Sequence, residues 1–130
     1  MCNATCQKFA AILNSEVLEH EDGMCIVMRM RDINACIEGR QSISPLALAA
    51  MFSFESMDCR GNTLNLGETV ILEDEIPEFS ALLMEYGIIV SAIHNHWLFD
   101  YPRLMYIHFQ SVEPPLAFAR KVAAAFRVLR

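Results

Sequence analysis

The sequence predicts an α+β fold: a mostly antiparallel sheet with helices packed on one face. Two observations lead to this prediction. Apolar residues recur at helical spacing near both ends and in the middle of the chain, and strand-like runs lie between them. The expected elements therefore follow the order α-β-β-β-β-α-β-β-α, in which helices do not alternate strictly with strands as they do in doubly wound parallel folds.

The first helix is expected over residues 5–19, where Phe9, Leu13 and Val17 recur every four residues. The acidic stretch that ends in Asp22 and Gly23 is expected to terminate this helix. Strands are expected over 24–31, 33–37, the second half of 45–55, and 63–72.

A second helix is expected to start in the acidic stretch 73–78, because negative charge and a proline suit the first turn. Gly87 suits its C-terminal cap. Strands over 88–97 and 103–112, joined by a turn, then precede a final helix that opens at Pro114 and Pro115. From Thr63 onward the order is β-α-β-β-α, most of a split β-α-β arrangement of ferredoxin-like type.

Length and charge narrow the classes of function. With 130 residues the chain is long enough for one domain, which we take as residues 1–130, and 54% of its residues are hydrophobic, which excludes disorder. The net charge of −6 and the lack of a basic cluster argue against nucleic acid as a partner. No run of residues is long and apolar enough to predict a membrane span. The apolar excess suggests that a partner covers part of the surface.

The cysteines give no disulfide or zinc pattern. There are five, an odd number, and no two of them have a CxxC spacing. The N-terminus, which includes Cys2, lacks the basic region followed by an apolar region that a secretory signal has. Together these observations predict reduced thiols and a cytoplasmic location.

Three of the four histidines lie within fifteen residues. His94 and His96 project from the same face of their strand, because side chains two apart in a strand point the same way. A hairpin whose paired residue numbers sum to an even value, near 202, would add His108 opposite His94. Three imidazoles on one face suit zinc or another first-row metal, whereas an odd register would remove His108 from the group.

Other residues near this hairpin have candidate roles. Glu73 and Glu75 are candidates for a catalytic base, a fourth ligand or partners that orient the imidazoles. Asn95, Arg103 and Tyr106 are candidates for binding a small ligand. Arg103 has a simpler alternative, an ion pair with Asp100, and Tyr106 one as sheet packing. The alternative for the histidines is a purely structural role, in which each imidazole bonds to backbone or water.

Three motifs resemble the LppY/LpqO family, a bacterial domain of unknown function. They are the strand and helix start over 67–77, the strand 86–96 that ends in His94-Asn95-His96, and the Pro-Arg strand 102–108. The likeness is specific over 67–125, looser before it, and spans one family repeat. It points to Glu73, Glu75, His94, Asn95, His96, Pro102, Arg103 and His108. Some family members carry two copies, which implies a homodimer for a single copy, and some resemble exported proteins.

The sequence thus leaves two hypotheses. In the first, the domain binds a divalent metal such as zinc, or a small polar ligand, at His94, His96 and His108, and any catalysis is metal-assisted hydrolysis. In the second, it is a non-catalytic binding or homodimeric assembly module in which the histidines are structural.

Overall fold

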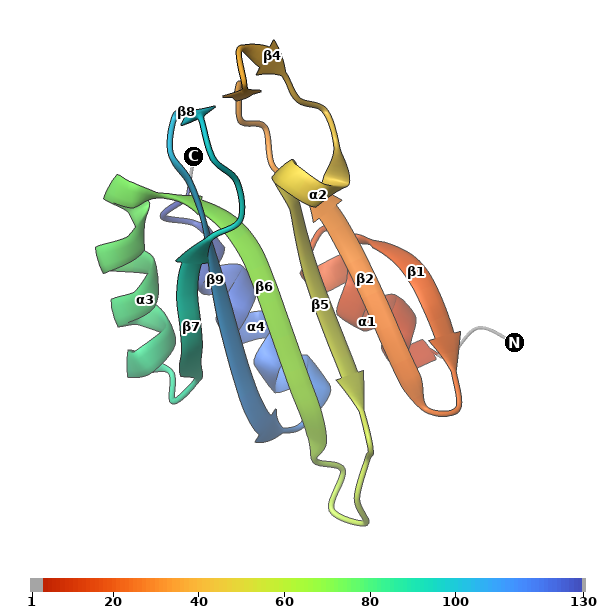
Figure 1. Ribbon diagram of the computed structural model, residues 1–130. Coiled ribbons are helices and arrows are strands. Elements are labelled where there is room, and N and C mark those ends of the chain that lie inside the picture. Colours follow the sequence, from red (N-terminus) through yellow and green to blue (C-terminus); the bar gives the residue numbers. More distant parts are fainter. Residues whose placement is uncertain (1–3, 130) are drawn as a thin grey trace.

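The computed structural model describes residues 4–129 and contains a six-stranded antiparallel sheet (Figure 1). Its strand order is β1-β2-β5-β6-β9-β7, and a three-stranded sheet of order β4-β3-β8 lies beyond one end. The large sheet comprises β1 (Glu16–Glu21), β2 (Met24–Met30), β5 (Ala49–Glu55), β6 (Thr63–Leu72), β7 (Ile89–Asn95) and β9 (Leu104–Glu113). The small sheet comprises β3 (Cys36–Ile37), β4 (Arg40–Gln41) and β8 (Asp100–Tyr101).

Three helices cover one face of the large sheet (Figure 1). They are α1 (Ala4–Ile12), α3 (Ile76–Glu85), which follows the 3-10 turn η1 (Glu73–Glu75), and α4 (Pro115–Phe126). Between helices and sheet lies a core with many aromatic side chains, including Phe9, Phe52, Phe79, Phe109 and Phe118, all fully buried. We call this side of the sheet the helix face.

The opposite side, which we call the open face, is covered only near one end. There the short helix α2 (Pro45–Leu48) places Ala47 and Leu48 in a small buried cluster with Val70, Leu104 and Tyr106. In the part of the chain that the structure describes, no helix lies over the remainder of the open face (Figure 1). Within residues 4–129, no helix has the length and apolar character needed to cross a membrane.

The α+β prediction is confirmed, and so is the split arrangement. Strands β6 and β7 both pair antiparallel with β9, which lies between them, and α3 connects the two outer strands. Helix α3 ends at Glu85 and is capped as expected by Gly87, whose φ is +79°. The N–H of Ile88 donates to the Leu83 carbonyl and that of Gly87 to the Met84 carbonyl, which is the Schellman pattern of a helix end.

The prediction of one helix over residues 5–19 is wrong in its second half. Helix α1 ends at Ile12, and Asn14 takes a left-handed φ of +51°. Residues Glu16–Glu21 then form β1, paired with β2 across the two-residue turn Asp22-Gly23. Both turn residues have positive φ, as a type I′ hairpin requires, so Asp-Gly here signals a hairpin rather than a helix end.

Two other strand predictions need smaller changes. Of the expected strand 33–37, only Cys36–Ile37 pairs, because it belongs to the small sheet. The apolar run from Pro45 begins as helix α2, with the Ser44 hydroxyl accepting from the Leu46 N–H, and becomes β5 at Ala49.

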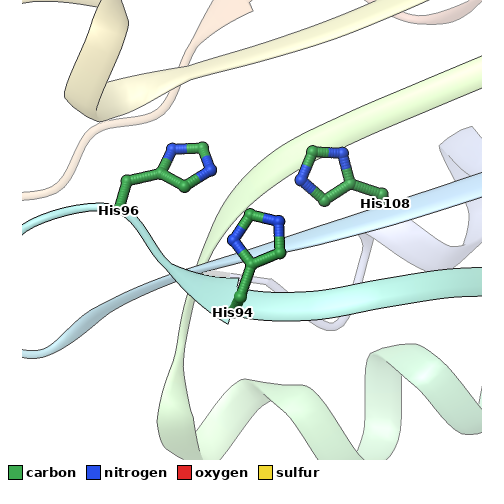
Figure 2. Close-up of side chains that lie close together, drawn as sticks. All are labelled: His94, His96 and His108. Carbon is green, nitrogen blue, oxygen red and sulfur yellow. The ribbon is translucent and has the colours of Figure 1, made fainter.

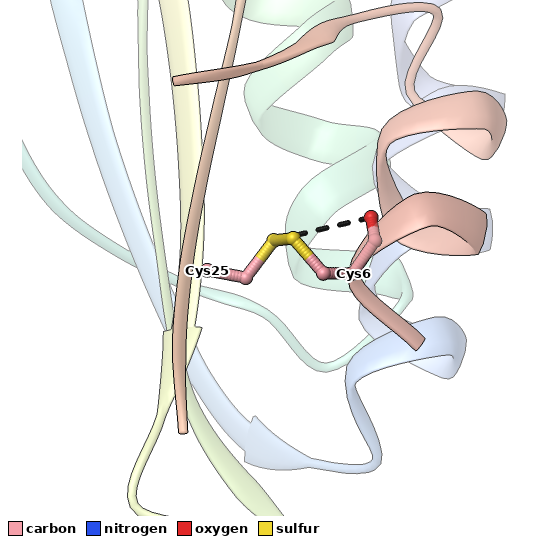
Figure 3. The surroundings of a disulfide bond; sticks show 2 residues. All are labelled: Cys6 and Cys25. Carbon is pink, nitrogen blue, oxygen red and sulfur yellow. Dashed lines mark hydrogen bonds between the residues drawn. A yellow bond between two sulfur atoms is a disulfide. The ribbon is translucent and has the colours of Figure 1, made fainter. Parts of the chain in front are cut away.

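The prediction that the cysteines are all reduced is wrong for one pair. Cys6 of α1 and Cys25 of β2 form a disulfide, with their Cα atoms 5.7 Å apart (Figure 3). Helix α1 packs over β2, and this contact between elements is not visible in the spacing of the cysteines. Cys36 and Cys59 are free thiols, while Cys2 lies outside the described residues.

Candidate functional site

The pairing of β7 with β9 brings the three histidines to the open face. His94 lies opposite Tyr106, and His108 lies opposite Ala92, so the paired numbers sum to an even value, as expected. The sum is 200 rather than 202, because 94 and 106, like 92 and 108, add to 200. The connection is longer than expected because Asp100–Tyr101 leave the hairpin to pair with β3.

The imidazoles form a compact cluster. Ring centroids are 4.8 Å apart for His94 and His96 and 4.8 Å for His94 and His108. Each ring offers one nitrogen, and these three atoms lie within 4.8 Å of one another. Figure 2 shows a nitrogen of each ring directed toward the space between the three side chains. Tetrahedral zinc would need nitrogens about 3.4 Å apart, so the rings must close slightly around an ion.

One nitrogen in the cluster lacks a partner. His108 Nε2 is buried and has no hydrogen-bond partner among residues 4–129, which is costly for a polar atom. Within the described residues, none of the three imidazoles bonds to the backbone. A buried ring nitrogen directed at two others is the arrangement that a bound ion would satisfy.

His96 has the most constrained ring of the three. It stacks on Tyr106, with centroids 3.9 Å apart and planes within 7° of parallel. Burial lowers the pKa of His96, and the neighbouring His94 and His108 lower it further, against a small opposing effect of Glu68. A lowered pKa favours the neutral imidazole, which is the form that coordinates metals.

The ring of Tyr106 lies against the ring of His96. Its hydroxyl accepts a hydrogen bond from Trp97 Nε1 at 2.7 Å and donates one to the Ala47 carbonyl at 2.9 Å. Burial raises the pKa of Tyr106, so the hydroxyl stays protonated. Tyr106 therefore lies in the site, with its hydroxyl already engaged.

The expected glutamates are not part of the cluster. The buried carboxylate of Glu75 forms two hydrogen bonds to Arg31, at 2.9 and 3.0 Å, and accepts a third from the Leu72 N–H. Glu73 is exposed and is not among the residues grouped with the histidines. The acidic residues Glu73–Glu75 thus follow β6 and begin the helical segment η1–α3, where negative charge is favourable.

Two of the expected ligand-binding residues also lie apart from the imidazoles. Asn95 alternates with His94 along β7 and donates to the Trp97 carbonyl at 3.2 Å. Arg103 pairs with Asp100, with 3.5 Å between Nε and Oδ1, which is the simpler of the two roles considered for it. Asp100 also accepts from the Leu104 N–H, so this pair orders the turn.

A groove adjoins the histidines on the open face, and sequence reasoning missed it. Its volume is about 300 Å³, and its lining includes His108, Glu68, Met51 and Leu66. Glu68 lies directly opposite His108 in the β6–β9 pair. The signal for Glu68 was present: it is the one acidic side chain among Leu64, Leu66, Val70 and Leu72, which alternate on the same face of β6.

Comparison with known proteins gives a family but no activity. No curated protein and no solved structure matches the chain significantly. Residues 7–128 match the family described as Domain of Unknown Function (DUF1259). Since this match covers nearly the whole chain, including every histidine of the cluster, the chain belongs to that family of uncharacterised domains.

Proposed function

We propose that the protein binds one divalent first-row transition metal, with zinc as the reference case, through His94, His96 and His108. The observation that carries this proposal is the meeting of three ring nitrogens within 4.8 Å, one of them buried without a partner. Imidazole nitrogens are ligands that zinc prefers, and three of them leave a fourth position open. That position would face the groove, where a small polar ligand can approach.

The mobility of the ligands fits such a site. His94 is exposed and makes no stacking contact with Tyr106, so its ring can rotate the short distance needed to close around an ion, whereas the ring of His96 is held against Tyr106. His108 is held between β6 and β7 in the sheet and supplies a fixed point. If the metal supports a reaction, metal-assisted hydrolysis is the class that a three-histidine site with an open position suits best.

Metal analysis tests the proposal. Purified wild-type protein, incubated with zinc and desalted, should retain one zinc per chain, and the His94→Ala/His96→Ala double variant should retain almost none. His20→Ala is the matched control, because His20 lies on β1, away from the cluster. Negligible zinc in all three proteins would overturn the proposal.

A second candidate is the assembly module, and one surface feature favours it. The turn between β7 and β9 exposes three large apolar side chains, with exposed fractions of 66% for Leu98, 76% for Phe99 and 82% for Tyr101. We infer that this turn contacts a second copy in a homodimer. Light scattering at micromolar concentration should give twice the mass of one chain, and a monomeric mass would contradict the inference.

Two finer assignments are also proposals. The motifs over 67–77, 86–96 and 102–108 support placement within the LppY/LpqO group. The Cys6–Cys25 disulfide favours an oxidising compartment over the cytoplasm expected from the sequence.

A further inference from the structure

The strand register orders the side chains of the open face into rows across the sheet. One row runs Met28, Met51, Glu68, His108 and Ala92, from β2 to β7. The next row runs Ile26, Ser53, Leu66, Gln110 and Ile89. These rows supply most of the groove lining.

Polarity changes along the first of these rows, from Met28 and Met51 to Glu68 and His108. The second row instead alternates apolar residues (Ile26, Leu66 and Ile89) with polar ones (Ser53 and Gln110). The end toward β7 and β9 carries the histidine cluster, whereas the end toward β2 and β5 carries Met51 and Ile26, with the partly exposed Leu66 beside them on β6. Adjacent strands lie about 4.8 Å apart, so Met51 is about 10 Å across the sheet from His108. Glu68 stands on the strand between them.

The position of Glu68 suits a base rather than a ligand. Side chains directly opposite each other in an antiparallel pair have Cβ atoms about 5 Å apart, which places the Glu68 carboxylate beside His108. Among the described residues, however, Glu68 is not one of those whose ligand atoms meet with the histidine nitrogens. Its carboxylate is thus near enough to bond a water on the ion without displacing an imidazole.

Resting on the metal site proposed above, we propose that the groove binds a neutral carboxylic ester with an apolar acyl chain, and that Glu68 is the catalytic base for its hydrolysis. The ester carbonyl carbon would lie beside a water held at the open position of the metal, and the acyl chain would extend over Leu66 and Met51 toward Ile26. A neutral substrate is favoured because an anionic chain would pass beside the Glu68 carboxylate.

The reaction balances with water as the only co-reactant. Glu68 would take a proton from the water at the metal site while the oxygen of that water bonds to the ester carbonyl carbon. The bond from that carbon to the alkoxy oxygen then breaks, and the departing alcohol takes the proton back from Glu68. The products are one carboxylic acid and one alcohol, and no oxidant or reductant takes part.

The test uses zinc-loaded protein and 4-nitrophenyl esters of acetate, hexanoate and the negatively charged hemisuccinate. Zinc-dependent hydrolysis is the rate above that of the metal-free protein, which removes the background of exposed imidazoles. Hexanoate should be cleaved about tenfold faster than acetate, because its additional methylenes are partly buried in the groove. Hemisuccinate should be cleaved more slowly than hexanoate.

Variants separate the base from the metal site. Glu68→Gln should keep its zinc and lose about a hundredfold of the zinc-dependent rate, the usual order of a general base. Glu55→Gln is the matched control: Glu55 is on the open face of β5 but does not line the groove, and its variant should keep the wild-type rate. Leu66→Ser should reduce the preference for hexanoate over acetate.

The outcomes distinguish the two proposals. If the wild-type protein does not bind zinc, the metal site itself is overturned. Full zinc binding with no zinc-dependent hydrolysis, or with equal rates for Glu68→Gln and wild type, would overturn the role of Glu68 and leave the metal site standing. Equal rates for the three esters would overturn the assignment of the groove.

Discussion

The two faces of the large sheet serve different purposes, and strand β9 shows the contrast between adjacent residues. Phe109 points to the helix face, is fully buried and contacts the rings of Phe52, Phe79 and Phe118. His108 points to the open face and ends in a nitrogen without a partner. The comparison indicates that side-chain packing on the helix face stabilises the fold. The open face is therefore available for polar and chemically active side chains.

The largest expected loss of stability distinguishes Phe109 from its neighbour His108. Phe109→Ala should cost about 3–5 kcal/mol in the free energy of unfolding, because it leaves a cavity among packed rings. His108→Ala should cost less than about 1 kcal/mol, since it also removes the unpartnered nitrogen. Urea denaturation measures both, and similar losses would contradict the division between the faces.

The disulfide should give the next largest effect on the helix face. Cys6→Ser/Cys25→Ser should destabilise the protein by about 3 kcal/mol, because the bond closes a loop of 19 residues' separation in the unfolded chain. Cys59→Ser, which alters an exposed free thiol, is the control. If thiol titration of the unfolded, non-reduced protein finds all five cysteines free, the disulfide account is wrong.

Gly67 tests how closely the helix face is packed. A Cβ built there would lie 2.2 Å from Cε2 of Phe109, so only glycine leaves room for that ring. Gly67→Ala should cost about 1–3 kcal/mol, as overpacked cores do. Phe109→Leu in the same chain should relieve part of this loss, and thermal melts of the single and double variants would show whether the two positions are coupled.

The smallest expected change in stability comes from the open face. His94→Ala should alter the free energy of unfolding of the metal-free protein by no more than about 0.5 kcal/mol, because the side chain is exposed. Added zinc should raise the melting temperature of the wild-type protein and not that of the variant. A similar rise in both proteins would place the zinc elsewhere.

Sequence periodicity predicted the fold class and the elements from Thr63 onward, because those elements have clear caps and alternation. It failed over residues 16–21, where Val17 fits a helical spacing with Phe9 and Leu13 equally well, and the Asp-Gly hairpin turn decided the structure. The Cys6–Cys25 bond was not predictable either, since it depends on how α1 packs over β2.

The candidate site was predicted in part. Strand alternation placed His94 and His96 on one face, but the sequence left open whether His108 joined them, because that depends on the hairpin register. The pairing of β7 with β9 supplies the even register, with Asp100–Tyr101 leaving the hairpin to join β3. The acidic residue near the cluster was also misjudged. Glu75 is close in sequence to the expected helix start but is held by Arg31, whereas Glu68 reaches His108 only through the pairing of β6 with β9.

X-ray absorption at the zinc edge tests the central claim most directly. The zinc-loaded wild-type protein should show three imidazole nitrogens at about 2.0–2.1 Å and one further light-atom ligand, with no sulfur at about 2.3 Å. His108→Ala should lose one imidazole from this shell or fail to hold the ion. A zinc bound through the sulfur of Cys36 or Cys59, or through a single histidine, would contradict the account.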